Sequence, residues 1–176
     1  MLPRAMPYLR AFRCFPAARR FPRGWCFRTT RRRPSFADFA LGVYPFLEFE
    51  HFHRAYYRVL EAFAAGRVRR LIVTMPPQHG KSVGATTLLP AYVLGLDPDC
   101  RVAIAAYSGT LASKFNRRVQ RILESQEYAA FFPDTSITRG AKPTDYNRKD
   151  DEVEILGRRG GLHTLGRERS LTGNDL

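Results

Sequence analysis

Cysteine is scarce in this sequence, and its spacing excludes two classes of protein. The 176 residues include three cysteines, Cys14, Cys26 and Cys100, and no two of them form a C-x-x-C pair. An odd number without that spacing argues against both a disulfide-stapled domain and a zinc-binding motif. We therefore interpret all three as free thiols in a reducing compartment.

Long apolar runs are also missing. No stretch approaches the roughly 18 consecutive apolar residues that a transmembrane helix requires, so we expect no membrane span. The length of the chain fits one domain, or one domain preceded by a tail.

Acidic residues are absent from the first 34 positions, which contain ten arginines. The formal net charge is +13, and the rest of the chain holds only 19 basic against 16 acidic side chains. Arginines mix with aromatic residues and prolines without a regular period, so residues 1–34 are predicted to form a disordered basic tail suited to nucleic-acid contact. Two other interpretations are an organelle transit peptide, against which the prolines argue, and a start codon assigned too early.

Residues 35–176 have the periodic patterns of a folded domain. A helix is predicted over residues 50–65, because apolar residues recur there at helical spacing and a glycine follows as a C-cap. Residues 71–74 are a short apolar, β-branched run that predicts a buried strand. A second helix is expected over residues 83–94, and Pro90 inside it must kink it or divide it in two.

Residues 101–107 predict another buried strand, and residues 110–125 predict a helix with an apolar face and a basic face. The apolar face comprises Leu111, Phe115, Val119, Ile122 and Leu123, and the basic face Lys114, Arg117, Arg118 and Arg121. The basic face is either a solvated surface or a contact for DNA. Two strand-like pieces around residues 157–161 predict either a hairpin or a strand with bends that glycine permits. This order of elements predicts an α/β fold, with a parallel sheet and helices on both of its faces.

Residues 75–82, Met-Pro-Pro-Gln-His-Gly-Lys-Ser, approximate the phosphate-loop pattern G-x-x-x-x-G-K-[ST]. Met75 replaces the first glycine, whereas the second glycine, the lysine and the serine are present. In this pattern Gly80 lets the backbone approach phosphates, Lys81 reaches the β- and γ-phosphates of ATP, and Ser82 offers its hydroxyl to Mg²⁺. The loop directly follows a predicted strand, and a helix is expected to begin at Lys81 and to point its positive end at the nucleotide, so the context supports nucleotide binding. The alternative is an ordinary strand-to-helix turn in which Lys81 is solvated.

Residues 69–82 resemble the Walker A region of phage and prophage terminase large subunits, which commonly lack the first glycine and have Pro-Pro-x-His-Gly-Lys-Ser. Further segments resemble that family in the same order along the chain: residues 50–53, 101–123, 131–133, 160–162 and 171–173. The resemblance covers about residues 35–176. It implies a P-loop NTPase fold of the RecA/ASCE-like type, in which these residues are the N-terminal part of the ATPase domain.

The resemblance also implies an activity and partners. A complete terminase hydrolyses ATP to drive double-stranded viral DNA into a procapsid and cuts that DNA with an endonuclease domain. Expected partners are the portal protein, the small terminase subunit and further copies of the chain in a ring, in the cytoplasm of a bacterial host. The expected ATP-binding residues are Pro77, Gln78, His79, Gly80, Lys81 and Ser82, with His53 near the adenine. His79 is expected to shape the loop, and core packing is the alternative role for His53.

Three departures from the family pattern affect the expected chemistry. The chain ends at Leu176, where relatives continue into a strand with the paired acidic residues of Walker B, and the nuclease domain is missing. Gln78 stands where many relatives have arginine. We therefore expect weak nucleotide binding, negligible turnover and marginal stability. Arg167 or Arg169 is a candidate finger that completes the site of a neighbouring subunit, and a solvated arginine is the alternative.

Two other classes of function remain open from the sequence. One is a different P-loop enzyme, such as a helicase or a kinase. The other is non-enzymatic: a non-functional prophage remnant, or a basic protein that binds nucleic acid non-specifically.

Overall fold

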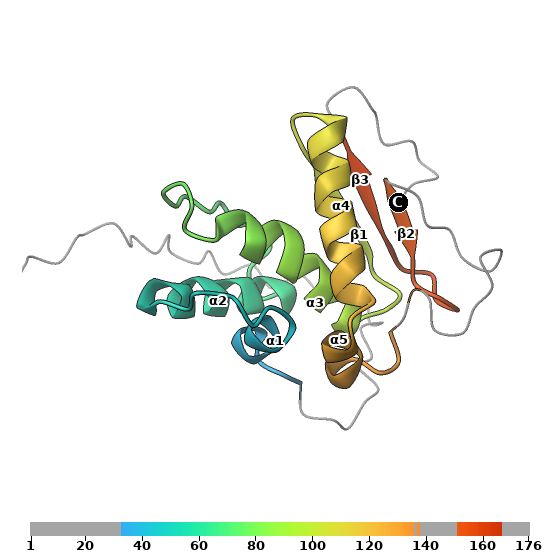
Figure 1. The fold of residues 1–176 in the computed structure, drawn as a ribbon, viewed down its shortest axis with the longest axis horizontal. Coiled ribbons are helices and arrows are strands. Elements are labelled where there is room, and N and C mark those ends of the chain that lie inside the picture. The colour runs from blue at the N-terminus through green and yellow to red at the C-terminus, as the bar shows by residue number, and fades with distance from the viewer. Residues whose placement is uncertain (1–32, 136, 138–150, 167–176) are drawn as a thin grey trace, which may run out of the picture.

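A computed structural model describes residues 33–135, 137 and 151–166, which form helices beside a small three-stranded sheet (Figure 1). Nearly all of the predicted tail, residues 1–34, lies outside these ranges. The elements in chain order are α1 (Phe36–Val43), α2 (His51–Ala64), the π-helix η1 (Val83–Leu88), α3 (Leu89–Leu96), β1 (Arg101–Ala105), α4 (Gly109–Leu123), α5 (Gln126–Phe131), β2 (Glu152–Glu154) and β3 (Gly161–Leu165). The fold is mixed α/β. No helix within the described ranges has the length and apolar character to cross a bilayer.

The sheet has the order β1-β3-β2 and is mixed rather than wholly parallel. β1 and β3 run parallel, with Arg101 opposite Gly161 and Ala105 opposite Leu165. β2 runs antiparallel to β3, which confirms the hairpin predicted around residues 157–161. The predicted parallel sheet is therefore correct for one of the two strand pairs, because the tight turn of a hairpin joins antiparallel strands.

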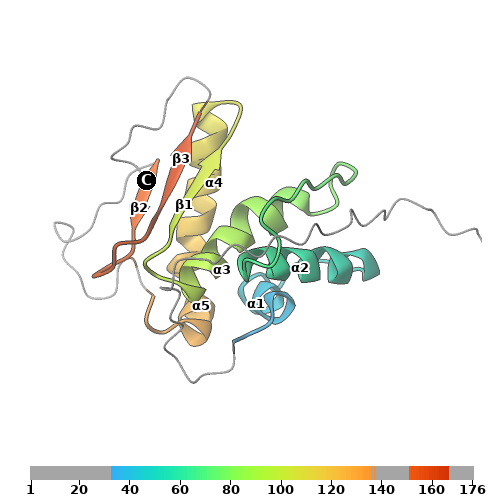
Figure 2. The same cartoon turned by 180° about the vertical axis from the view of Figure 1, so that it is seen from behind.

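One face of the sheet is covered, by α4, which contacts both β3 and β2. Figure 2 shows the opposite face with no described helix over it. Ile104 of β1 is buried, whereas Arg101, Ala103 and Ala105 are exposed. The expectations of helices on both faces and of a buried strand at residues 101–107 are thus wrong for the described part of the chain, because one-sided covering buries only alternate residues of a strand.

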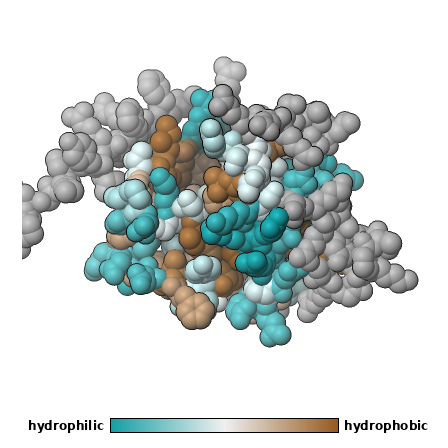
Figure 3. All heavy atoms as spheres, turned by 45° about the horizontal axis from the view of Figure 1, so that its top comes forward, coloured by the Kyte–Doolittle hydropathy of each residue, from teal (hydrophilic) through white to brown (hydrophobic). Residues whose placement is uncertain are grey.

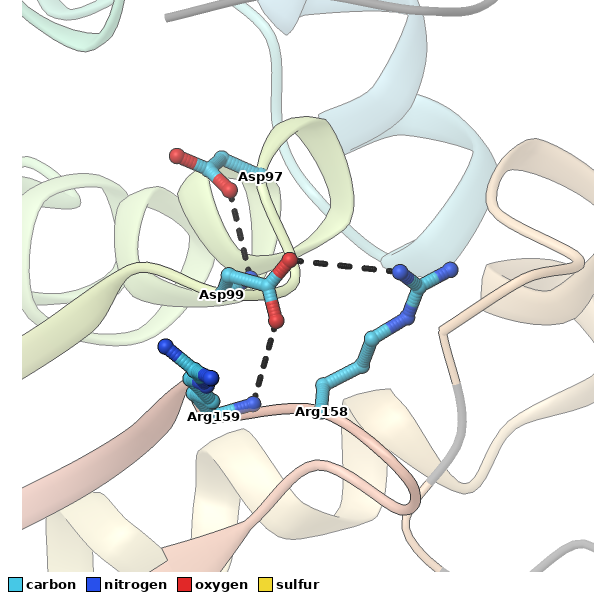
Figure 4. Close-up of polar contacts among 4 residues, drawn as sticks. All are labelled: Asp97, Asp99, Arg158 and Arg159. Carbon is cyan, nitrogen blue, oxygen red and sulfur yellow. Dashed lines mark hydrogen bonds and ion pairs between the residues drawn. The ribbon is translucent and has the colours of Figure 1, made fainter. Parts of the chain in front are cut away.

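A polar cluster fixes the hairpin to the turn that precedes β1 (Figure 4). The Oδ1 atom of Asp99 accepts a 3.0 Å hydrogen bond from the backbone N–H of Arg159, and its Oδ2 atom lies 3.9 Å from the Arg158 guanidinium. Asp97 accepts from the backbone N–H of Asp99 at 3.2 Å. A side chain at Gly160 would meet the carbonyl oxygen of Pro98 at 2.2 Å, so this close approach requires glycine.

Aromatic side chains dominate the core between the helices. The Phe36 ring makes edge-to-face contacts with Tyr57 and Tyr92, with centroids 5.1 Å apart in both pairs. Ser35 caps α1 by accepting from the backbone N–H of Asp38. Aromatic pairs of this kind contribute about 0.5–1.5 kcal/mol each beyond the burial of their apolar area. The contacts of Phe36 therefore fix α1 against the helices that carry the candidate site.

The predicted helix at residues 110–125 is confirmed as α4, but its buried face is not purely apolar. Val119, Ile122 and Leu123 are buried as predicted, whereas Leu111 is 39% exposed. Asn116 and Gln120 are buried instead and form a hydrogen-bonded chain. The Asn116 amide donates to the Thr164 hydroxyl at 3.3 Å, which ties α4 to β3.

The predicted buried strand at residues 71–74 is wrong. No described strand pairs with these residues, and the side chain of Ile72 is 91% exposed. Leu71 and Val73 pack against the core, so the segment is buried on one side only. β-branched residues favour a strand only when a neighbouring strand supplies hydrogen bonds.

Large apolar side chains also remain exposed elsewhere. Phe46 is 91% and Tyr107 78% exposed. Figure 3 shows hydrophobic surface directly beside hydrophilic side chains on one face of the molecule. Scattered exposed apolar residues are ordinary in folded proteins, so none of them defines a site by itself.

Candidate nucleotide-binding loop

The phosphate-loop residues form a turn that opens the long helix made of η1 and α3. In Figure 1 this turn projects from the end of that helix, away from the sheet. The helix begins at Lys81, as the sequence predicts. Helix N-termini present free N–H groups and a partial positive charge, which suit anionic ligands.

Two residues of the turn have left-handed backbone conformations. The φ angles are 64° at Gln78 and 71° at Gly80. Gly80 adopts this angle without steric cost, whereas Gln78 is an unusual residue for it. A ring nitrogen of His79, Nδ1, lies 2.7 Å from the carbonyl oxygen of Pro77 and donates to it when protonated. The His79 ring thus contacts the loop backbone, and its expected role in shaping the loop stays a prediction.

Lys81 and Ser82 lie at the first positions of the helix, and both are exposed. The Ser82 side chain makes no capping hydrogen bond. Within the described ranges, no ion pair is formed by the Lys81 ammonium group. The polar groups of both side chains are therefore accessible to a ligand in solution.

His53 packs directly under the loop. Its Nδ1 atom accepts a 2.9 Å hydrogen bond from the backbone N–H of Glu50, so the neutral ring carries its proton on Nε2. The side chain is 5% exposed, and Nε2 has no hydrogen-bond partner among the described residues. A Cβ atom at Gly80 would lie 3.1 Å from Nε2. The structure thus brings His53 to the loop, with a buried donor facing Gly80.

Tyr56 contacts the first turn of the helix and was not expected as a site residue. Its hydroxyl donates a 2.8 Å hydrogen bond to the carbonyl oxygen of Lys81. Burial raises the pKa of Tyr56 to about 12, and the nearby Tyr57 adds to this shift, while a hydrogen bond from the backbone of Ala85 lowers it. The sequence signal was its place three residues after His53, on the same face of α2.

The Tyr56 hydroxyl bonds to the backbone just before η1. An α-helix would pair the carbonyl of Lys81 with the N–H of Ala85, whereas here this carbonyl accepts a hydrogen bond from the Tyr56 hydroxyl. Downstream, the N–H of Leu89 donates to the carbonyl of Gly84, five residues back. Pro90, the second residue of α3, has no N–H to donate. The helix predicted at residues 83–94 therefore changes type near Pro90 rather than dividing in two.

Gly84 makes this contact possible. A Cβ atom at this position would lie 2.6 Å from Cε1 of Tyr56. Real Cβ atoms do not approach so closely, so a larger residue would displace either the ring or the helix. Packing against Tyr56 thus requires glycine at position 84, whereas the left-handed backbone angle favours glycine at position 80.

The structure does not describe the two arginines that are expected to complete a neighbouring site. Arg167 and Arg169 lie outside the described residues, so their role as a finger stays a prediction. Within residues 33–135, 137 and 151–166, no group of three or more His, Cys, Asp or Glu side chains is arranged to hold a metal ion. Cys100 is a free thiol, and burial raises its pKa; Cys14 and Cys26 lie outside the described ranges.

Comparison of the chain with protein-family models, with curated proteins and with solved structures found no match.

Proposed function

We propose that the chain binds ATP together with Mg²⁺ at residues 76–82, as the nucleotide-binding part of a DNA-packaging motor of the terminase large-subunit type. One observation carries the nucleotide part of this proposal. A turn with two left-handed residues, Gln78 and Gly80, leads directly into a helix whose first side chains are Lys81 and Ser82. Left-handed residues in a tight turn direct successive N–H groups into one concavity, which is the common geometry of anion-binding loops.

Each residue has a definite role in this proposal. The backbone N–H groups around Gly80 hold phosphate oxygens, and the exposed ammonium of Lys81 neutralises the β- and γ-phosphates. Ser82 offers its hydroxyl to a Mg²⁺ ion that the nucleotide brings with it. Pro77 and His79 hold the turn, because the Pro77 carbonyl lies within hydrogen-bond distance of the His79 ring.

His53 supports the loop from below. Its buried Nε2–H faces Gly80 and lacks a partner among the described residues. A buried unpaired donor costs about 1–3 kcal/mol, so a ligand or a loop movement that supplies an acceptor is favoured. In this proposal His53 responds to the occupied loop rather than contacting adenine through a polar group.

The packaging part of the proposal is supported by the terminase-like motifs around the loop. In that setting the chain acts on double-stranded DNA, assembles as a ring with portal protein and small terminase subunit, and works in the cytoplasm of a bacterial host. Arg167 or Arg169 completes the ATP site of a neighbouring copy. Replacing both arginines by glutamine in a full-length terminase that carries this segment should abolish ATP turnover and leave ATP binding intact.

Binding of a fluorescent ATP analogue tests the nucleotide site. We expect Mg²⁺-dependent binding that weakens by at least roughly tenfold, equivalent to about 1.4 kcal/mol, in the Lys81→Ala variant. Lys114→Ala is the matched control, because Lys114 is an exposed lysine on α4. Equal affinities for the wild type and Lys81→Ala would reject the phosphate loop and favour the non-enzymatic nucleic-acid-binding alternative.

A further inference from the structure

We propose that the protein has a second phosphate-binding site, in the groove between the end of α1, the helix η1 and the helix α4. The groove has a volume of about 470 Å³, within the range of roughly 300–1,000 Å³ that is usual for small-molecule sites. None of residues 76–82 lines the groove, although Val83, which directly follows Ser82, does; the inference does not depend on ATP binding at the loop.

Two arginines form the charged wall of the groove. Arg118 and Arg121 lie three residues apart on α4 and so share one side of that helix. Both are exposed, and neither forms an ion pair within the part of the chain that the structure describes. No acidic side chain among the described residues lines the groove. The guanidinium groups are thus unneutralised and able to bind an anion in the bidentate manner that phosphate favours.

Thr87 supplies an independent indication of a ligand. Its side chain lines the same groove and is only 3% exposed. The Oγ1 atom is buried and has no hydrogen-bond partner among the described residues. A threonine hydroxyl within a helix ordinarily bonds to a backbone carbonyl of the preceding turn. Here the hydroxyl has an unused proton, and in the proposed site a phosphate oxygen accepts it when the groove is occupied.

The remaining lining favours a phosphate carried on an organic group. Val43, Val83 and Ile122 provide an apolar surface beside the arginines, and the exposed ring of Tyr44 lies at the same groove. Arginine, hydroxyl and apolar groups in one groove suit a phosphate attached to a sugar. Two sources share this chemistry: the backbone of a nucleic acid and a free nucleotide or other small phosphate compound.

Titration of the full-length chain tests the site. Pyrophosphate and a short DNA duplex are titrated separately into ¹⁵N-labelled protein, and amide shifts are followed at Thr87 and at residues 118–122. The Arg118→Gln/Arg121→Gln variant should bind either ligand at least roughly tenfold more weakly. For the duplex, the slope of the logarithm of the binding constant against the logarithm of the salt concentration should fall in magnitude by about two. Thr87→Val, which keeps the shape and removes the hydroxyl, should bind roughly three- to tenfold more weakly.

Arg58→Gln, at an exposed position on α2, controls for general charge, and Lys81→Ala separates this site from the loop. In both variants the affinity of the groove for each ligand should stay within about twofold of the wild-type value. Shifts at Thr87 with pyrophosphate identify a small phosphate ligand, shifts with duplex DNA alone identify the nucleic-acid backbone, and either result supports the site. The proposal is overturned if neither ligand shifts the Thr87 amide, or if Arg58→Gln weakens binding as much as the double variant. Thermal melting of each variant confirms that it is folded.

Discussion

The side-chain hydroxyl of Tyr56 and the backbone carbonyl of Lys81 are joined by a 2.8 Å hydrogen bond between residues 25 positions apart. The bond lies at the first turn of the helix that follows the candidate phosphate loop. It links the position of Lys81 to α2, which also carries His53. The loop is therefore held from one neighbouring helix by two side chains, one under Gly80 and one at Lys81.

Removal of this hydroxyl should change both the helix and the loop. In Tyr56→Phe the Lys81 carbonyl and the Ala85 N–H become free to pair with each other, as in an α-helix. We expect a loss of about 0.5–1.5 kcal/mol in the free energy of unfolding and weaker binding of the ATP analogue. Urea denaturation and analogue titration measure the two effects.

Tyr57→Phe is the matched control for that variant. The Tyr57 hydroxyl is buried but has no hydrogen-bond partner among the described residues. Its removal should leave stability unchanged or slightly higher, because a buried unpaired hydroxyl is unfavourable. Equal destabilisation by the two substitutions would contradict a specific role for the Tyr56 bond.

Gly84→Ala should destabilise the protein although alanine favours helices. The new Cβ would meet the Tyr56 ring at 2.6 Å, and overpacking of this kind costs about 1–3 kcal/mol, more than the roughly 1 kcal/mol gained from helix propensity. Gly109→Ala is the control, because nothing lies within 4 Å of a Cβ at that position. Its melting temperature should stay the same or rise, and a similar fall for both variants would contradict the packing argument.

His53→Ala should destabilise α2 and loosen the loop. The substitution removes the acceptor for the Glu50 N–H, a capping interaction typically worth about 1 kcal/mol, and leaves a void beneath Gly80. His51→Ala, at an exposed neighbouring position, should change the free energy of unfolding by no more than about 0.5 kcal/mol. Hydrogen exchange at residues 79–82 should accelerate in the first variant alone; equal protection in both would show that His53 does not support the loop.

Local signals predicted much of this structure. The helix at residues 50–65 appears as His51–Ala64, and the start of a helix at Lys81 was correct, because periodicity and capping are encoded in neighbouring residues. The hairpin at residues 157–161 was found for the same reason: its glycines and flanking apolar residues lie together in the sequence.

Structural features that depend on residues far away in the sequence were not predicted. The π-helical turn packs against Tyr56, which reaches it from another helix, and no pattern within residues 83–88 indicates it. Asn116 and Gln120 appear polar in a helical projection, yet Asn116 bonds to Thr164, 48 residues further along the chain. The one-sided burial of residues 71–74 likewise follows from which elements lie beside them, so tertiary contacts overrode local propensity.

The buried tyrosines predict a specific loss of stability in alkaline solution. Burial raises the pKa of Tyr57 to about 12, from an ordinary value of 10.0. Tyr92 is raised to about 12 as well, by burial first and then by the charge of Glu61. The folded state keeps these protons more tightly than the unfolded state does. Their stabilising contribution is therefore complete below about pH 10 and is lost as the pH rises from about 10 to 12.

Tyr57→Phe isolates one of these groups, because phenylalanine cannot ionise. The free energy of unfolding is measured by urea denaturation at intervals from pH 8 to about pH 11.5. As the pH rises, the variant should gain stability relative to the wild type, since only the wild type loses the Tyr57 contribution. Tyr107→Phe is the control, because the Tyr107 side chain is 78% exposed; its stability relative to the wild type should stay constant. A constant difference for Tyr57→Phe over the same interval would show that burial does not hold the Tyr57 proton.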